Sequence, residues 1–100
     1  MVTTALKIAG FTLLLATPLA AQDKTFLCNT SGEIVGAAVT LRVSGASNAA
    51  TIKSISKSLE GDKATFKPAV QPIVDWVYTL DEPLLTDEVA PAYVEACLAQ

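Results

Sequence analysis

Apolar side chains recur at intervals of three and four residues along most of the chain after residue 32. The repeat is clearest in four stretches, residues 33–43, 49–59, 68–80 and 87–97. This is the spacing of one face of an α-helix, whereas a half-buried strand would alternate apolar and polar positions. The pattern predicts an all-α fold, a small bundle of about four short helices.

Two stretches would also suit a strand, and an α+β fold with strands at 34–43 and 73–80 is the alternative. Both are rich in β-branched or aromatic side chains, which favour strands. Gly36 lies inside the first stretch and costs a helix about 1 kcal/mol relative to alanine. The spacing of the apolar positions nevertheless favours helices in both.

Residues typical of helix ends separate the four stretches. Gly45 and Gly61 are predicted to end the first two helices, Ser47 and Thr86 to cap the second and the last, and Pro68 and Pro72 to lie in the first turn of the third. The connections between the helices are therefore expected to be short.

The first 21 residues have the three parts of a secretory signal peptide. Lys7 supplies the positive charge, Ile8–Leu15 the apolar segment, and Ala20 and Ala21 the small residues at the expected cleavage site. The apolar run is shorter than the roughly 20 residues of a transmembrane helix. We expect cleavage after Ala21, with an uncleaved interfacial anchor as the alternative. The mature protein would be one domain, residues 22–100, periplasmic or secreted and without stable membrane insertion.

Cys28 and Cys97 are the two cysteines of the chain. In an oxidising compartment they have one intramolecular pairing available. Val89, Tyr93, Ala96 and Cys97 share one face of the last predicted helix, which is expected to point inward. A Cys28–Cys97 disulfide would close a loop of about 70 residues and contribute on the order of 4 kcal/mol. A domain of this size needs such a constraint because its core is small.

The charges are distributed unevenly along the sequence. The six basic residues that follow the signal segment lie between Lys24 and Lys67, and six acidic residues follow Lys67: Asp75, Asp81, Glu82, Asp87, Glu88 and Glu95. This argues against nucleic acid and anionic membrane surfaces as partners. We expect the basic first half to pack beside the acidic second half. An acidic face kept for a basic partner is the alternative.

Several chemistries are missing from the sequence. The chain has no histidine, the commonest general base and metal ligand. It has no C-x-x-C motif for redox work or haem attachment, and its "SGAS" segment lacks the context of a phosphate-binding loop. We therefore predict no catalytic residues, no metal, no cofactor and no enzymatic activity.

Trp76 and Tyr78 are the candidate partner contacts. On a helix they would point to different sides, so that one is expected in the core and the other at the surface. Arg42, the one arginine of the chain, is expected either to clamp a carboxylate or to stand as a solvated charge at a helix end.

Three short motifs resemble a pattern found in small secreted proteobacterial proteins of unknown function. They are Arg42-Val43-Ser44-Gly45, then Ile73-Val74 with Val77-Tyr78 and Pro83, and finally the late Cys97. The resemblance implies helices and one disulfide, and it carries no activity. The segment "APAYVEAC", residues 90–97, resembles the surroundings of the second cysteine in periplasmic acid-stress chaperones of the HdeA type, which are small, helical and tied by one disulfide.

These observations favour a non-enzymatic exported domain that binds a protein or an envelope component. An acid-stress chaperone is one alternative, in which protonation of the late carboxylates would weaken their pairing with the basic half and release apolar surface. An immunity or inhibitor protein is another, as a version of the binding hypothesis.

Overall fold

The computed structural model describes the backbone of residues 2–100 and the side chains of residues 23–100. It contains four α-helices: α1 (Val2–Val43), α2 (Asn48–Ser58), α3 (Lys67–Val77) and α4 (Val89–Leu98). Two short 3₁₀ helices, η1 (Gly61–Phe66) and η2 (Glu82–Leu84), lie in the connections. The predicted all-α fold with a disulfide is confirmed. The predicted signal peptide, residues 1–21, lies outside the residues whose side chains are described and stays a prediction.

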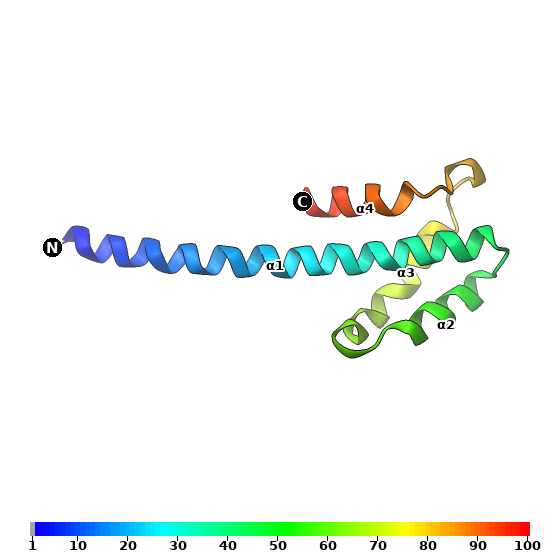
Figure 1. Cartoon of the computed structure of the whole chain (residues 1–100), viewed down its shortest axis with the longest axis horizontal. Coiled ribbons are helices and arrows are strands. Elements are labelled where there is room, and N and C mark those ends of the chain that lie inside the picture. Colours follow the sequence, from blue (N-terminus) through cyan, green and yellow to red (C-terminus); the bar gives the residue numbers. More distant parts are fainter. Residues whose placement is uncertain (1) are drawn as a thin grey trace.

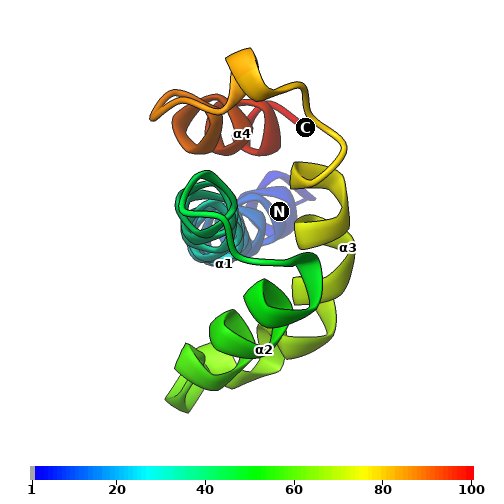
Figure 2. The ribbon, with the colours of Figure 1, turned by 90° about the vertical axis from the view of Figure 1, so that its right-hand side faces the viewer.

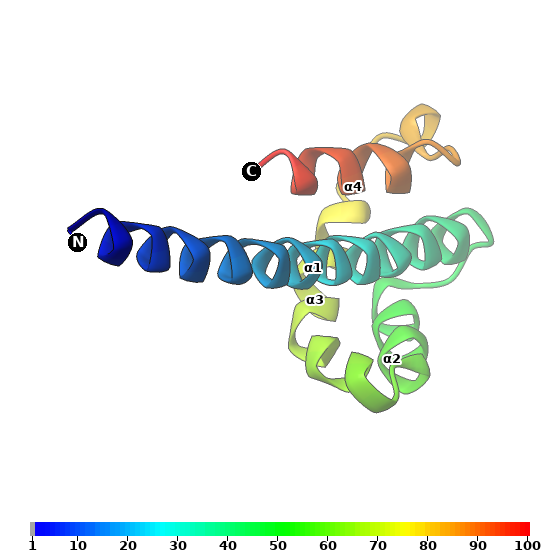
Figure 3. The same ribbon diagram turned by 60° about the vertical axis from the view of Figure 1, so that its left-hand side comes forward.

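The helices are arranged around the C-terminal part of α1, which is the central element (Figure 1). Helix α4 runs antiparallel along one side of α1 (Figures 1 and 3). Seen from the end, α4 and α2 lie on opposite sides of α1, and α3 stands beside α1 and links the two sides (Figure 2). Each of the helices α2, α3 and α4 can therefore bury one face against α1.

The alternative with strands at 34–43 and 73–80 is wrong, since no strand occurs in the part of the chain that the structure describes. The first stretch lies in α1 and the second in α3 and the turn after it. The helical spacing decided the outcome, because Val70, Val74 and Val77 all point into the core and are fully buried. An extended strand would have placed Val74 and Val77 on opposite faces.

The core is built mainly from small aliphatic side chains of three helices. Its buried members are Ile34, Val35, Ala38, Val39, Ile55, Leu59, Val70, Val74 and Val77. Helix α4 adds half-buried residues to this core and has no fully buried one. The disulfide and close backbone packing therefore matter more for holding α4 than core burial does.

The turn between α1 and α2 follows the predicted residues. Gly45 has φ +97°, a left-handed conformation that favours glycine. The amides of Gly45 and Ala46 donate to the carbonyls of Arg42 and Leu41, each at 3.0 Å, which is a Schellman motif. The Ser47 hydroxyl then accepts from the Ala50 amide at 3.1 Å and caps α2.

Several details of the helices differ from the sequence predictions. Helix α1 begins well before residue 33, where the first predicted helix starts. Helix α2 ends at Ser58, because Leu59 is extended and buries its side chain in the core, and Gly61 begins η1 instead of ending α2. Pro72 lies inside α3 instead of in its first turn. It is tolerated on the exposed side, where the lost hydrogen bond to the Pro68 carbonyl can be replaced by water.

Helix α4 begins later than predicted. Glu88 is its N-cap and makes no side-chain capping bond, while the Thr86 hydroxyl accepts from the Glu88 amide at 3.3 Å, one step before the helix. The predicted inward face also needs a correction, since Val89, Tyr93 and Cys97 are half-buried but Ala96 is exposed. The contact with α1 is completed by Ala90 and Val94, which lie over Gly36 and Gly32.

Candidate functional site

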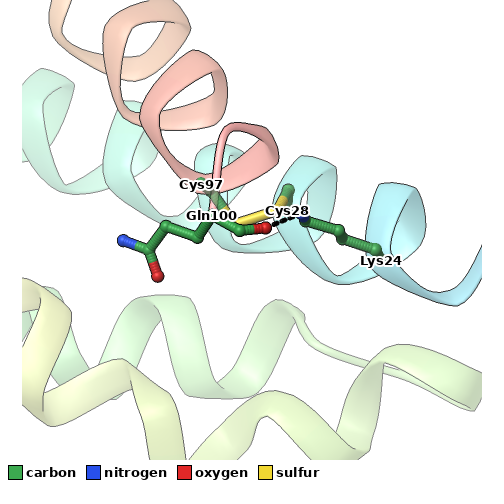
Figure 4. Close-up of a disulfide and its surroundings, with 4 residues drawn as sticks. All are labelled: Lys24, Cys28, Cys97 and Gln100. Atoms are coloured by element: carbon green, nitrogen blue, oxygen red, sulfur yellow. Dashed lines mark hydrogen bonds between the residues drawn. A yellow bond between two sulfur atoms is a disulfide. The ribbon is translucent and has the colours of Figure 1, made fainter. Parts of the chain in front are cut away.

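The disulfide joins Cys28 in the middle of α1 to Cys97 in the last turn of α4 (Figure 4). The two Cα atoms are 5.7 Å apart, and 69 positions separate the residues in sequence. Cys28 is fully buried, whereas Cys97 is half-buried. Beside the bond, the Lys24 amine donates to the backbone carbonyl of Gln100. The predicted pairing is therefore confirmed, and its visible effect is to fix the end of α4 on α1.

Tyr78 and Trp76 are separated as the helical phase predicts. The Tyr78 hydroxyl donates to the Ala46 carbonyl at 2.7 Å and lies 2.7 Å from the hydroxyl of Thr51, which is fully buried. Tyr78 thus ties the end of α3 to the α1–α2 turn. Trp76 is 42% exposed. Of the two candidate contacts, Trp76 is the one whose side chain is available at the surface.

Arg42 has a different role from both predictions made for it. Its Nη1 donates to the carbonyls of Val77 and Leu80, at 2.7 and 2.5 Å, at the C-terminal end of α3. The guanidinium also lies over the Tyr78 ring, 5.6 Å from its centroid. A cation beside the last carbonyls of a helix satisfies groups that the helix itself leaves unbonded. Arg42 therefore caps α3 from α1, instead of clamping a carboxylate or standing in solvent.

An apolar hollow lies at the end of α4, next to the disulfide. It has a volume of about 310 Å³ and is lined by Leu27, Tyr93, Ala96, Cys97 and Gln100. Tyr93 also packs against Trp76, with the ring centroids 6.0 Å apart. The residues Leu27, Trp76, Tyr93 and Ala96 are called the aromatic surface below. Three helices contribute to it.

Of the four members of the aromatic surface, Trp76 is the one that the sequence indicates as a candidate contact. The sequence places Tyr93 and Ala96 on the inward face of the last predicted helix, and it gives no direct signal for Leu27. Leu27 is 51% exposed, although it is the neighbour of the fully buried Cys28. The available signal was this position beside Cys28, because the residue next to an inward-facing cysteine on a helix points elsewhere.

The predicted packing of a basic first half against an acidic second half is not observed as ion pairing. The single ion pair among residues 23–100 joins Lys63 and Glu33 at 2.8 Å, and both side chains are exposed. None of the six acidic residues after Lys67 takes part in an ion pair within that range. Asp75 accepts a hydrogen bond from Asn48 Nδ2 at 3.0 Å. The late carboxylates are therefore left facing solvent.

The Lys63–Glu33 pair shifts the pKa of its lysine. The hydrogen bond from Lys63 to Glu33 and the attraction between their charges raise the pKa of Lys63 above its ordinary value of 10.5. The pair joins η1 to α1, so that its contribution depends on the folded arrangement.

Two features are absent among the side chains of residues 23–100. No group of three or more cysteine, aspartate or glutamate side chains is arranged to hold a metal ion there. No helix in the same part of the chain has an apolar stretch long enough to cross a membrane.

The candidate site is thus a surface with an exposed tryptophan, an apolar hollow and unpaired carboxylates near it. Comparison with protein families, with curated proteins and with solved structures finds no significant match to this chain.

Proposed function

We propose that this protein is an exported, non-enzymatic binding domain whose partner contacts the aromatic surface. The observation that carries the proposal is the position of Trp76. It is 42% exposed and rests against Tyr93, while valines on the same helix fill the core. Tryptophan and tyrosine are the residues most enriched at the energetic centres of protein interfaces.

The surroundings of Trp76 support recognition because they hold the surface in one shape. The disulfide fixes the end of α4 on α1, and Arg42 and Tyr78 fix the end of α3 on α1 and the following turn. A surface that is already ordered loses less conformational entropy when its partner binds. The apolar hollow beside Tyr93 provides a concave contact next to the flat indole.

The partner is a protein or a component of the cell envelope. The disulfide supports residence in an oxidising compartment, the periplasm or the exterior, where a bond of this kind persists. Cleavage of the signal peptide after Ala21 is part of the same proposal. An immunity or inhibitor protein would be one form of it, with the aromatic surface covering a site on its target.

The acid-stress chaperone is the less favoured proposal. Its mechanism needs ion pairs between the late carboxylates and the basic half that acid would break. No such pair is found among residues 23–100.

Capture from an envelope extract with matched variants tests the proposal. Leu27 and Leu84 are 51% and 55% exposed, and Leu84 lies outside the aromatic surface. Leu84→Ala is therefore a matched control, because it makes the same substitution at a similarly exposed position. Tagged exported protein should retain a stoichiometric partner, and Trp76→Ala and Leu27→Ala should each reduce its recovery. Leu84→Ala should leave the recovery unchanged. A partner whose recovery is insensitive to Trp76 and Leu27, with circular dichroism showing intact folds, would refute the proposal.

A further inference from the structure

Resting on the proposed function, we infer that the partner of the aromatic surface is a polypeptide segment that combines apolar side chains with lysine or arginine. The proposal thus separates a protein partner from a lipid or another anionic envelope component. Three observations on α4 and its surroundings support it.

First, residues of α4 line two hollows. One is the apolar hollow lined by Leu27, Tyr93, Ala96, Cys97 and Gln100. The other has a volume of about 270 Å³ and is lined by Asp87, Glu88, Pro91, Ala92 and Glu95. Ala92 and Ala96 are four residues apart, about one helical turn, so that a segment lying along α4 contacts both hollows.

Second, the charged side chains that line the second hollow are all acidic. Asp87, Glu88 and Glu95 are exposed, and none of them is in an ion pair within the described side chains. The chain has no basic residue after Lys67 that could neutralise them. Lys24 lies beside the disulfide, where its amine donates to the Gln100 carbonyl. A complementary partner therefore carries positive charge.

Third, the surface also exposes large apolar side chains, which a charged partner without apolar groups would not cover. Trp76 and Leu27 are 42% and 51% exposed. A partner that only neutralised the carboxylates would leave this area in water. Cationic and apolar side chains on one polypeptide segment meet both requirements, whereas a membrane rich in anionic headgroups would be repelled.

Trp76 makes the experiment direct, because it is the single tryptophan of the chain and lies on the surface in question. The probe is an amphipathic peptide of leucine and lysine, with glutamate in place of every lysine in the comparison peptide. The lysine peptide should shift the Trp76 emission to shorter wavelength, and this binding should weaken as salt is raised, since the Debye length falls from about 10 Å at 0.1 M to about 3 Å at 1 M. The glutamate peptide should produce no shift.

Charge-neutral variants locate the effect on α4. Glu88→Gln with Glu95→Gln should weaken the lysine peptide about three- to tenfold, the range expected for two exposed charge contacts. Glu60→Gln with Asp62→Asn removes two exposed carboxylates at η1 and should leave the affinity unchanged.

The inference is overturned by equal binding of the two peptides, by the absence of any Trp76 shift, or by equal effects of the two double variants. A Trp76 shift with phosphatidylglycerol vesicles and none with the lysine peptide would overturn it in favour of a lipid. These results are separate from the capture experiment: a partner that depends on Trp76 but not on the α4 carboxylates would leave the proposed function standing.

Discussion

Gly32 of α1 lies directly against Val94 of α4, and a Cβ atom at Gly32 would stand 2.2 Å from the Cγ2 of Val94. No real Cβ contact is that short, so the absence of a side chain is what allows the two helices to approach. A Cβ atom at Gly36, one turn further along α1, would lie 3.5 Å from the Cβ of Ala90, which is an ordinary contact distance. The two glycines therefore have different physical roles.

We predict opposite effects for alanine at these two positions. Gly32→Ala should destabilise the protein by about 1–3 kcal/mol, the usual cost of overpacking, because α4 must move away from α1. Gly36→Ala should stabilise it by up to about 1 kcal/mol, because alanine is the better helix residue and has room. Urea unfolding followed by circular dichroism measures both.

A double variant checks the cause of the Gly32 effect. Val94→Ala removes the methyl group that Gly32→Ala would strike, so that the combined loss should be smaller than the sum of the two single losses. Strict additivity would show that the contact with Val94 is not responsible.

Replacing Cys97 by alanine should lower the melting temperature by well over ten degrees. Loss of a native disulfide in a small domain costs about 2–5 kcal/mol, and each kcal/mol corresponds to about 4–8 °C for a domain of this size. Reduction of the wild-type protein should reproduce the shift. A change of only a few degrees would mean that α4 is held without the bond.

Arg42→Ala should destabilise the protein by about 1–3 kcal/mol. The substitution removes the charge-assisted hydrogen bonds to the Val77 and Leu80 carbonyls and the contact with the Tyr78 ring. Arg42→Lys keeps the charge but loses the planar group, and should recover part of the loss. Chemical denaturation measures the order of stability of the wild type and the two variants. Equal stability of the alanine and lysine variants would show that the planar guanidinium group is not what stabilises the end of α3.

Tyr78→Phe should cost about 1–2 kcal/mol, because the Thr51 hydroxyl is fully buried and loses its partner. Thr51→Val in the same background should restore much of that stability by removing the unbonded hydroxyl. A fully additive pair in the double-mutant cycle would contradict the hydrogen bond between the two side chains.

The Lys63–Glu33 pair predicts a small alkaline effect on stability. The pKa of Lys63 is raised in the folded protein, so its contribution is complete below the ordinary value of 10.5 and is lost as the pH rises through the higher folded value. The urea midpoint of Glu33→Gln should therefore lie below that of the wild type near pH 9 and approach it near pH 12. A constant difference across this interval would exclude the linkage.

Local signals in the sequence determined the helices, several of their ends and the disulfide. The 3.6-residue spacing of Val70, Val74 and Val77, the left-handed Gly45 and the Ser47 cap act within a few residues, so their outcome does not depend on the rest of the fold. The pairing of Cys28 with Cys97 followed from their number and from the inward phase of Cys97.

The tertiary structure alone decided which groups meet across the chain. The sequence shows Gly36 as a cost in a helix, and only the approach of α4 shows why small residues stand at Gly32 and Gly36. The sequence allows Arg42 to bind a carboxylate or to stand in solvent. In the structure it caps α3, because α3 ends beside it. The same packing brings Trp76 against Tyr93 and leaves the α4 carboxylates unpaired. Such contacts join residues far apart in sequence, and their positions are set by the packing of whole helices.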